Sequence, residues 1–314
     1  MGKIWTMGEL LVEVMRPEED MEFYLPLTFK GPYASGSSGI FIRTAARMGA
    51  EAGIISGVGK DDFGKCILDH LRADGVDVSH VLTSSRSSTG VAFVMYHSNG
   101  DRKFIFHWDN TPAVEAKMPE LSELGDVSFF HMMGCALTSS KVYAKEIIKT
   151  MHGLKERGAK ISFDPNIREE HMKEPGDYAI IQEVIASTNV FMPGVAELKL
   201  VTGEDDVEQA VKKCFEYPQM DIIALKNGSK GSTVYTRESR IDVGAYRVKA
   251  LDATGAGDSF DGAFLASLAL GRTLEEAAKA GAAAGALNAA AFGPMEGDIS
   301  PETVAEMIAK GERA

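Results

Sequence analysis

The sequence predicts an α/β protein with a mostly parallel central sheet, helices on both faces of that sheet, and a small strand-rich lid. Short, continuously apolar segments alternate with amphipathic segments along most of the chain, a pattern typical of parallel strands buried on both faces. Hydrophobic residues make up 45% of the 314 residues, which is enough for an ordinary buried core. Two segments of strict alternation do not fit the repeat, and they indicate the lid.

The strands of the main sheet are expected where short apolar runs occur. These are residues 3–15, 53–58, 127–132, 159–163, 190–192 and 222–225, followed by a hairpin over 233–248. Helices are expected where apolar residues recur at spacings of three and four. These segments are 40–48, 63–73, 140–155, 178–186, 197–201, 207–215, 259–270, 274–291 and 301–310.

The lid is expected to come from two separate stretches. Residues 16–38 are rich in Pro, Gly and Ser and are expected to be irregular, with several aromatic side chains. Residues 90–96 and 103–107 alternate between apolar and polar, and Ser-Asn-Gly-Asp at 98–101 has the turn chemistry of a β-hairpin. We therefore expect one domain over residues 1–314, with a lid formed by about 12–37 and 88–110.

Charge and cysteine content exclude several classes of protein. A net charge of −12 argues against nucleic acid or an anionic membrane as the main partner, because both require a basic surface. The three cysteines are far apart in the sequence and form no Cys-x-x-Cys pair, so we expect reduced thiols. No signal peptide and no apolar run long enough to span a bilayer are present, and we expect a cytoplasmic protein.

One loop of small residues is the strongest candidate for a functional site. Gly255, Ala256 and Gly257 stand directly before Asp258 and the helix expected at 259–270. Backbone N–H groups at a helix N-terminus lack intrahelical partners, and the helix dipole adds positive charge there, so the loop suits an anion such as phosphate. Asp258 is either a helix cap or a base that takes a proton from a substrate hydroxyl.

Further polar clusters follow predicted strands, where ligands of open parallel sheets bind. These residues are Asp164, Asn166 and Arg168 after one strand, Gly194 and Glu197 after the next, and Lys226, Gly228 and Gly231 after a third. Each alone has a structural explanation, as a turn, a surface residue or a hairpin entrance. Together with the glycine loop they provide an anion site, a base and a carboxylate for Mg²⁺, as phosphoryl transfer requires. The P-loop and Gly-x-Gly-x-x-Gly motifs are absent.

Two of these blocks resemble the signatures of a known family. Residues 252–263 resemble the C-terminal signature of the ribokinase/PfkB carbohydrate kinases, and residues 35–49 with 57–64 resemble the N-terminal one. The resemblance extends over essentially the whole chain. It implies a ribokinase-like three-layer α/β/α fold and transfer of the γ-phosphate of ATP to a primary hydroxyl of a small sugar.

The resemblance also implies roles for individual residues. Asp258 would be the base, and the amides of Gly255, Ala256 and Gly257 would form the anion hole. Glu197 would hold Mg²⁺ through water, and Asp252 would belong to a monovalent-cation site, which K⁺ would occupy. Lys226, Gly228, Gly231, Thr254, Gly255, Gly257, Asn288 and Phe292 would contact ATP. The sugar would contact Glu13, Gly36, Ser37, Ile40, Arg102, Phe106, Asn166, Arg168 and Asp258. The lid would pair with that of a second subunit, giving a homodimer.

Three departures from the family pattern concern the sugar pocket, and a fourth, at Gly194, concerns the metal site. Glu13 stands where the family has Asp, Ser35 where it has Gly, Ile40 where it has Asn, and Gly194 replaces the Asn of its Asn-x-x-Glu motif. The second lid strand lacks the Arg of 2-keto-3-deoxygluconate kinases, since Arg102 precedes it and can face solvent. Glu13 adds negative charge near Glu9 and disfavours an acidic sugar.

These departures favour a neutral ketohexose, fructose or tagatose. The alternatives are 2-keto-3-deoxygluconate, a nucleoside stacked on lid aromatics such as Phe106, and a non-enzymatic sugar sensor. The sensor is disfavoured because a pure binding protein has no need of the base at Asp258.

Overall fold

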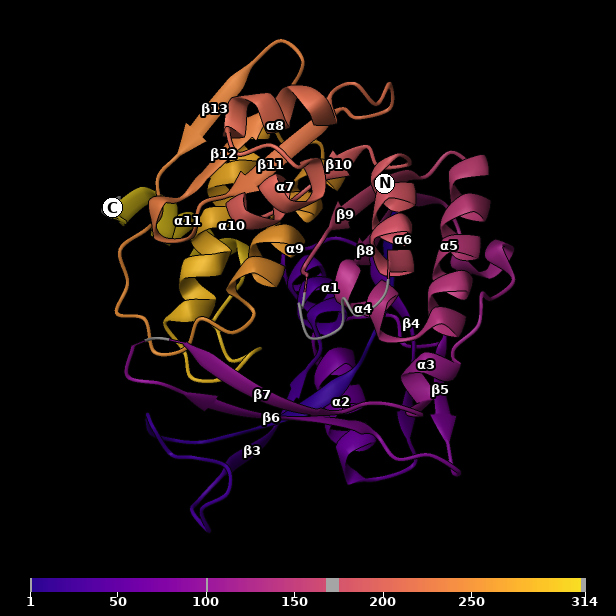
Figure 1. Cartoon of the computed structure of the whole chain (residues 1–314), viewed down its shortest axis with the longest axis vertical. Helices are drawn as coiled ribbons and strands as arrows, with labels where there is room; N and C mark the ends of the chain where they lie inside the picture. The colour runs from indigo at the N-terminus through magenta and orange to yellow at the C-terminus, as the bar shows by residue number, and fades with distance from the viewer. Residues whose placement is uncertain (1, 100, 168–174, 312–314) are drawn as a thin grey trace.

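The computed structural model describes residues 2–99, 101–167 and 175–311, which form two sheets and the helices around them. The large sheet has nine strands in the order β13-β12-β11-β10-β9-β8-β1-β4-β5 (Figure 1). Their bounds are β1 Lys3–Met7, β4 Ala52–Gly59, β5 Val81–Ser84, β8 Val127–Met133, β9 Lys160–Asp164, β10 Val190–Phe191, β11 Ile222–Lys226, β12 Ser232–Tyr235 and β13 Arg240–Val243. All neighbouring strands are parallel except at β11–β12 and β12–β13, which confirms the mostly parallel sheet.

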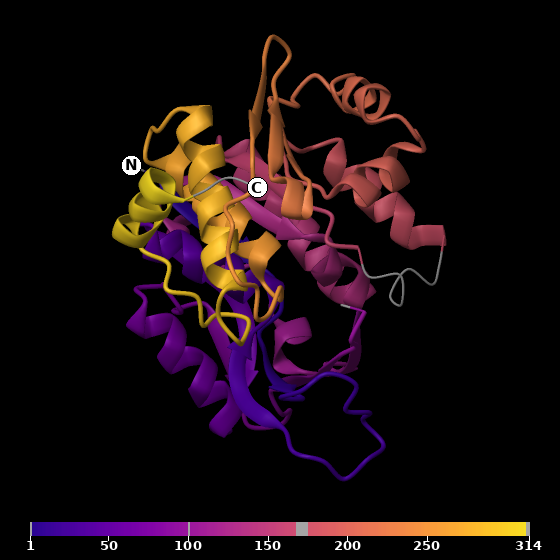
Figure 2. The ribbon, with the colours of Figure 1, turned by 90° about the vertical axis from the view of Figure 1, so that its left-hand side faces the viewer.

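Helices cover both faces of the large sheet, as Figure 2 shows from the side. One apolar core lies under α1 (Ser37–Arg47), α2 (Asp62–Ala73), α9 (Ala256–Ala269), α10 (Leu274–Ala289) and α11 (Pro301–Lys310). The other lies under α3 (Pro112–Glu115), α4 (Gly134–Ser139), α5 (Lys141–Glu156), α6 (Pro175–Ile185), α7 (Val195–Thr202) and α8 (Val207–Cys214). Short 3₁₀ turns occupy Leu121–Leu124 and Gly228–Lys230. The expected three-layer α/β/α fold is therefore confirmed. No helix in the described part of the chain is long and apolar enough to cross a membrane.

The small sheet has four strands in the order β3-β2-β6-β7. Their bounds are β2 Leu11–Met15, β3 Lys30–Ser35, β6 Gly90–Tyr96 and β7 Arg102–His107. They come from the two stretches expected to form the lid. Arg16 is completely buried behind this sheet, where its guanidinium donates to backbone carbonyls of the β2–β3 loop, among them those of Glu22 and Leu25. That loop projects away from the large sheet in Figure 2.

Several sequence-based boundaries were wrong. The strand expected over 3–15 is two strands in different sheets, because the chain leaves the large sheet after Met7 and enters the small sheet at Leu11. Gly8 lies in the connection, where a Cβ would collide with the side chain of Ser38. Part of the segment expected to be irregular, Lys30–Ser35, pairs with β2 as a strand. The hairpin at 233–248 ends with β13 at Val243. The strand β5 and the short helices α3 and α4 were not expected. A segment of four to six residues carries too little periodicity to stand out.

Candidate active site

A cavity of about 210 Å³ lies between the small sheet and the carboxyl ends of the large-sheet strands. The small sheet contributes Leu11, Glu13, Ser35, Arg102, Phe104 and Phe106. The chain after β1 contributes Glu9, and that after β8 contributes Cys135. Strands β9 and β11 end at Asp164 and Lys226, which also line the cavity. The loop before α9 and the first turn of that helix close the remaining side. The cavity thus stands where an open parallel sheet binds its ligands.

Most of the predicted site residues line this one cavity. They are Glu13, Gly36, Ser37, Ile40, Arg102, Phe106, Asn166, Glu197, Lys226, Thr254, Gly255, Gly257 and Asp258. Ala256, Gly228, Gly231, Asp252, Asn288 and Phe292 are not part of the cavity lining. Arg168 lies outside the described residues. The structure therefore brings together the predicted anion, base and sugar residues, whose chemical roles stay predictions.

The helix after the glycine loop begins earlier in the sequence than expected. Helix α9 begins at Ala256, and Gly255 is its N-cap, with a left-handed backbone at φ 76°. The first intrahelical bond runs from the Ser259 N–H to the Gly255 carbonyl at 2.8 Å, so the amides of Gly257 and Asp258 precede it. Ala256 is less suited to an anion, because its N–H donates to the Ala253 carbonyl at 3.3 Å.

Asp258 lies in the first turn of α9 and is not its cap. Its carboxylate accepts from Nδ2 of Asn166 at 3.2 Å, and the same amide donates to Oγ of Ser37 at 3.0 Å. Asn166 has φ 36°, a strained conformation that Asn tolerates better than most residues. The turn after β9 is thus bent so that its amide orients the carboxylate at the cavity wall. A carboxylate in this position can accept a proton from a bound hydroxyl.

A lysine bridges two buried carboxyl groups behind the glycine loop. Nζ of Lys226 lies 2.7 Å from Oδ2 of Asp164 and 2.9 Å from Oδ2 of Asp261. Burial opposes the charged form of Asp164, but the Lys226 ammonium outweighs this and holds the Asp164 pKa below its usual range. Burial and the charge of Asp164 raise the pKa of Asp261 far above its usual range. These opposite pKa shifts favour the ionised form of Asp164 and the neutral form of Asp261.

The candidate metal residue Glu197 is oriented by backbone amides. Its Oε1 accepts from the Ile167 N–H at 2.8 Å, and its Oε2 accepts from the Gly194 N–H at 2.7 Å. Burial, and then the charge of Asp164, raise the pKa of Glu197. Among the described residues no group of three or more His, Cys, Asp or Glu side chains is arranged to hold a metal. This geometry suits a carboxylate that contacts a metal through water better than a complete protein cage.

Two buried acidic side chains also line the cavity. Glu13 is 5% exposed and accepts from Oγ of Ser35 at 2.7 Å. Glu9 is 3% exposed and accepts from Ser38 at 3.3 Å and from the Cys135 thiol at 3.5 Å. Burial raises the pKa of Glu9. These carboxyl groups are acceptors suited to sugar hydroxyls.

The small sheet supplies an aromatic wall and a cation. Trp108 packs with Leu11 and the partly buried Phe106, and both Trp108 and Phe106 line the cavity. Arg102 was expected to precede its strand and to be able to face solvent. It is the first residue of β7, and its Nη1 donates to Oγ1 of Thr254 at 3.2 Å. Although exposed overall, this guanidinium therefore lies at the cavity wall.

Four residues expected to contact ATP have other contacts. Asn288 is completely buried, and its amide donates to the Thr254 carbonyl at 2.7 Å, so it supports the glycine loop. Phe292 packs edge-on against Tyr33 of the small sheet. Gly231 lies where a Cβ would collide with the Val243 carbonyl, so it shapes the β12–β13 hairpin. Gly228 is exposed in the turn after β11.

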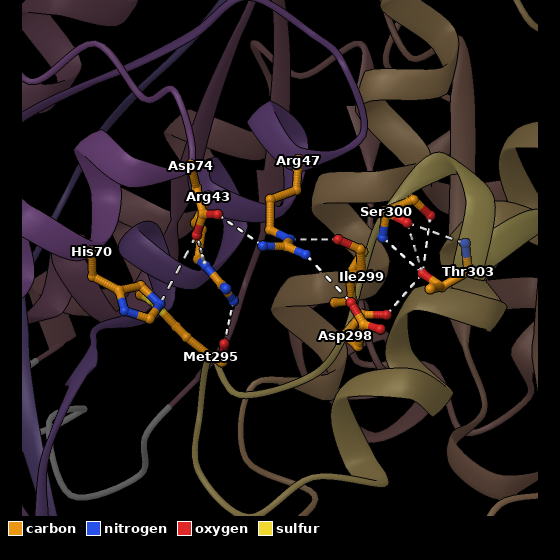
Figure 3. A network of polar contacts seen from close by, with 9 residues as sticks. All are labelled: Arg43, Arg47, His70, Asp74, Met295, Asp298, Ile299, Ser300 and Thr303. Carbon is orange, nitrogen blue, oxygen red and sulfur yellow. Dashed lines mark hydrogen bonds and ion pairs between the residues drawn. The ribbon is translucent and has the colours of Figure 1, made fainter.

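The segment after α10 is fixed to helices α1 and α2 by an arginine cluster (Figure 3). Arg43 donates to the Met295 carbonyl, and Arg47 donates to the Ile299 carbonyl. Both guanidinium groups pair with Asp74, which follows α2. The anchored segment is next to the glycine loop, because a Cβ on Gly255 would meet the Pro294 carbonyl at 2.5 Å.

The sequence analysis missed several cavity residues. Glu9, Leu11, Ser35, Phe104, Trp108, Cys135 and Ala253 line the cavity but were not proposed as site residues. Asp164 was expected in a polar cluster at a strand end, where ligands bind, but was given no role of its own. Glu9 lay within the single strand expected over 3–15, which hid its position after β1. Leu11, Ser35 and Cys135 carry no comparable signal, because only the packing of the two sheets brings them to the site.

Comparison with known proteins agrees with this geometry. The profile of the pfkB family carbohydrate kinases matches residues 38–301. Fructokinase-1 of Oryza sativa subsp. japonica is 29% identical over 302 residues, covering 92% of each chain. The fructokinase of Klebsiella pneumoniae is 27% identical and covers 85% of each chain.

Solved structures share the fold over nearly the whole chain. The crystal structure of a putative ribokinase II from E. coli has a TM-score of 0.94 and 35% identity, covering 99% of this chain and 100% of the other. A fructokinase double mutant from Vibrio cholerae O395 has a TM-score of 0.85 and 24% identity, covers 98% of each chain, and shows the fold alone. With the family profile and these relatives in agreement, the chain belongs to the pfkB family of carbohydrate kinases and is a sugar kinase.

Proposed function

We propose that this sugar kinase transfers the γ-phosphate of ATP to a primary hydroxyl of a neutral ketohexose, with fructose as the first candidate and tagatose as the second. The observation that carries the proposal is the position of Asp258, in the first turn of α9 directly after the small-residue loop and in the lining of the cavity that Glu9 and Glu13 also line. The fructokinase relatives support fructose, since the sequence match to them extends over most of the chain.

Asp258 would take the proton of the attacking hydroxyl, with Asn166 fixing its orientation. The amides of Gly257 and Asp258, with the dipole of α9, would stabilise the charge on the transferred group. Arg102 and Lys226 add positive charge to the same region of the cavity. Glu13 and Glu9 would accept hydrogen bonds from the sugar hydroxyls, and the aromatic wall would exclude water.

ATP and Mg²⁺ are the proposed co-substrate and cofactor. The 35%-identical E. coli protein has also been solved in complex with ATP and Mg²⁺. Mg²⁺ would neutralise phosphate charge, and Glu197 would hold it through water. Gly228, Gly231 and Phe292 are proposed to flank the nucleotide outside the cavity. Asp252 is proposed as the residue nearest a monovalent cation, because a V. cholerae fructokinase variant was solved with a potassium ion bound.

We further propose a cytoplasmic homodimer in which the small sheet acts as a lid and pairs with the lid of a second copy. Tyr24 is 81% exposed, and Leu25 and Leu27 are 40% and 42% exposed on the β2–β3 loop, an apolar group suited to such a contact. The three cysteines are free, as expected in a reducing compartment. Analytical ultracentrifugation of the wild type and of Leu25→Glu tests the dimer, and a monomeric wild type contradicts it.

The substrate is tested by ADP release from Mg-ATP with fructose, tagatose, ribose, 2-keto-3-deoxygluconate and common nucleosides. We expect turnover with fructose or tagatose. Asp258→Asn should lower kcat by about 10³-fold while leaving the ATP dissociation constant nearly unchanged. Asp62→Asn, which alters an exposed first-turn aspartate of α2, is the matched control. Turnover with nucleosides alone, or sugar binding without ADP release, contradicts the proposal.

A further inference from the structure

Tyr96 connects the small sheet to the chain segment that enters α9. It is the last residue of β6, and its hydroxyl lies 2.5 Å from Oδ1 of Asp252 and 3.0 Å from Oγ1 of Thr254. Figure 1 shows the end of the β6–β7 hairpin at which β6 ends and β7 begins beside this segment. Arg102, from the neighbouring strand, reaches the same threonine. The position of the small sheet is therefore linked directly to residues 252–254.

The same segment determines where α9 begins. The Asp252 carboxylate also accepts from the Thr254 N–H at 2.8 Å and from the Gly293 N–H at 3.0 Å. The Thr254 carbonyl is held from the other side by Asn288. The next residue, Gly255, is the N-cap of the helix whose first turn contains Asp258. A shift of Asp252 or Thr254 is therefore transmitted to the proposed anion site and base within a few bonds.

Asp252 needs these donors because it is only 1% exposed. A buried carboxylate is costly unless positive charge or hydrogen-bond donors compensate it. Within the described residues three donors contact it, and the Tyr96 hydroxyl is the one that comes from the small sheet. Burial and the neighbouring Asp252 charge raise the pKa of Tyr96, so the hydroxyl keeps its proton and remains a donor at neutral pH.

We propose that Tyr96 is a positioning residue for phosphoryl transfer, whose hydroxyl couples the closed small sheet to the anion-binding loop through Asp252. The hydroxyl donates a hydrogen bond that compensates part of the Asp252 charge, as a monovalent cation near this carboxylate would also do. Because of this, the K⁺ proposed near Asp252 should change the turnover of the wild type only a little. This inference rests on the proposed sugar-kinase reaction and adds to it a residue that is not part of the cavity lining.

Tyr96→Phe tests the coupling, because it removes the hydroxyl and keeps the ring. A hydrogen bond to a charged group is strong, so we expect kcat to fall by about 10- to 100-fold, with the sugar KM changed by less than about threefold. KCl should restore part of the lost turnover in the variant and change the wild type little. Choline chloride at the same ionic strength controls for screening. Tyr178→Phe, at a 40% exposed tyrosine of α6, is the control variant.

Amide hydrogen exchange gives a measurement that needs no sugar. In Tyr96→Phe we expect faster exchange over residues 252–258, and in Tyr178→Phe we expect exchange there to be unchanged. Wild-type turnover in Tyr96→Phe overturns the proposal. The proposal is also overturned if KCl restores no more turnover to Tyr96→Phe than choline chloride does. It is overturned as well if turnover falls while amide exchange at 252–258 is unchanged. If the wild type phosphorylates none of the sugars tested, the proposed function fails, and the exchange experiment alone decides the coupling.

Discussion

Asn166 donates to the Asp258 carboxylate at 3.2 Å, although the two residues come from the ends of different elements. The contact joins the turn after β9 to the first turn of α9 across the cavity. An amide donor in this position stabilises the ionised carboxylate, and an ionised carboxylate is what a general base requires.

Asn166→Asp replaces this donor by a like charge. We expect kcat to fall by about 10- to 100-fold at neutral pH, and the acid limb of the kcat profile to move to higher pH, because two adjacent carboxylates resist full ionisation. The kcat profile between pH 5 and 9 measures this. Asn110→Asp is the control, since Asn110 also has a positive φ, 58°, but is exposed away from the cavity. An unshifted acid limb would contradict the orienting role of Asn166.

The two carboxyl groups around Lys226 should respond differently to amide substitution. Asp261→Asn keeps a neutral donor beside Asp164, so kcat should stay within about threefold of the wild type. Asp164→Asn removes the ionised partner and leaves the buried ammonium poorly compensated. We expect that variant to lose about 3 kcal/mol of unfolding free energy and most of its turnover.

Urea unfolding and steady-state kinetics of both variants measure this difference. The two substitutions are each other's matched control, because both replace a buried aspartate that contacts Lys226. Equal losses in the two variants would show that Asp261 is ionised, contrary to the raised pKa that its burial and the charge of Asp164 produce.

Glu13→Gln should change substrate preference. The side chain keeps its length and its contact with Ser35 but loses its negative charge. We expect the ratio of kcat/KM for 2-keto-3-deoxygluconate to that for fructose to rise by about tenfold, because an acidic sugar is no longer repelled. Glu18→Gln, at an exposed position beyond β2, should leave the ratio unchanged. If Glu13→Gln leaves it unchanged as well, this carboxylate does not select against acidic sugars.

Asp74→Asn should destabilise the protein in a pH-dependent way. Burial opposes ionisation of Asp74, but its bonds with Arg43 and Arg47 prevail and lower its pKa. A lowered pKa in the folded state means that the stabilisation is fully present above the unfolded value of about 4 and is lost as pH falls through the folded value.

We expect the variant to be about 3 kcal/mol less stable than the wild type at pH 7, and the difference to shrink below about pH 4. Urea unfolding at several pH values measures it. Asp69→Asn, in α2, breaks an exposed i,i+4 pair with Lys65 and should change the unfolding free energy little. A difference that stays constant from pH 7 to pH 3 would contradict the role of the Asp74 charge.

The order of the main elements and most of the cavity could be predicted from the sequence. Periodicity placed α9 and α10 within a few residues, and strand-end position brought Lys226, Asn166 and Asp258 into one predicted site. These are local signals, since a helix face or a strand end depends on residues only a few positions apart. The strand boundary at Gly8 and the helix boundary at Ala256 were wrong, because residue propensity does not indicate where a strand leaves one sheet or which residue caps a helix.

By itself, then, the sequence determined the α/β class, the glycine loop with its adjacent carboxylate, and the family signatures. Only the tertiary structure decided what that loop contacts. Tyr96 reaches Asp252 across 156 positions, and Lys226 reaches Asp164 across 62. Such pairs depend on the strand order of the large sheet and on the position of the small sheet against it. Neither can be deduced from the spacing of residues in the sequence. Burial then separates the pKa values of the two carboxyl groups around Lys226, because the ammonium lowers the pKa of Asp164 while burial and the charge of Asp164 raise the pKa of Asp261.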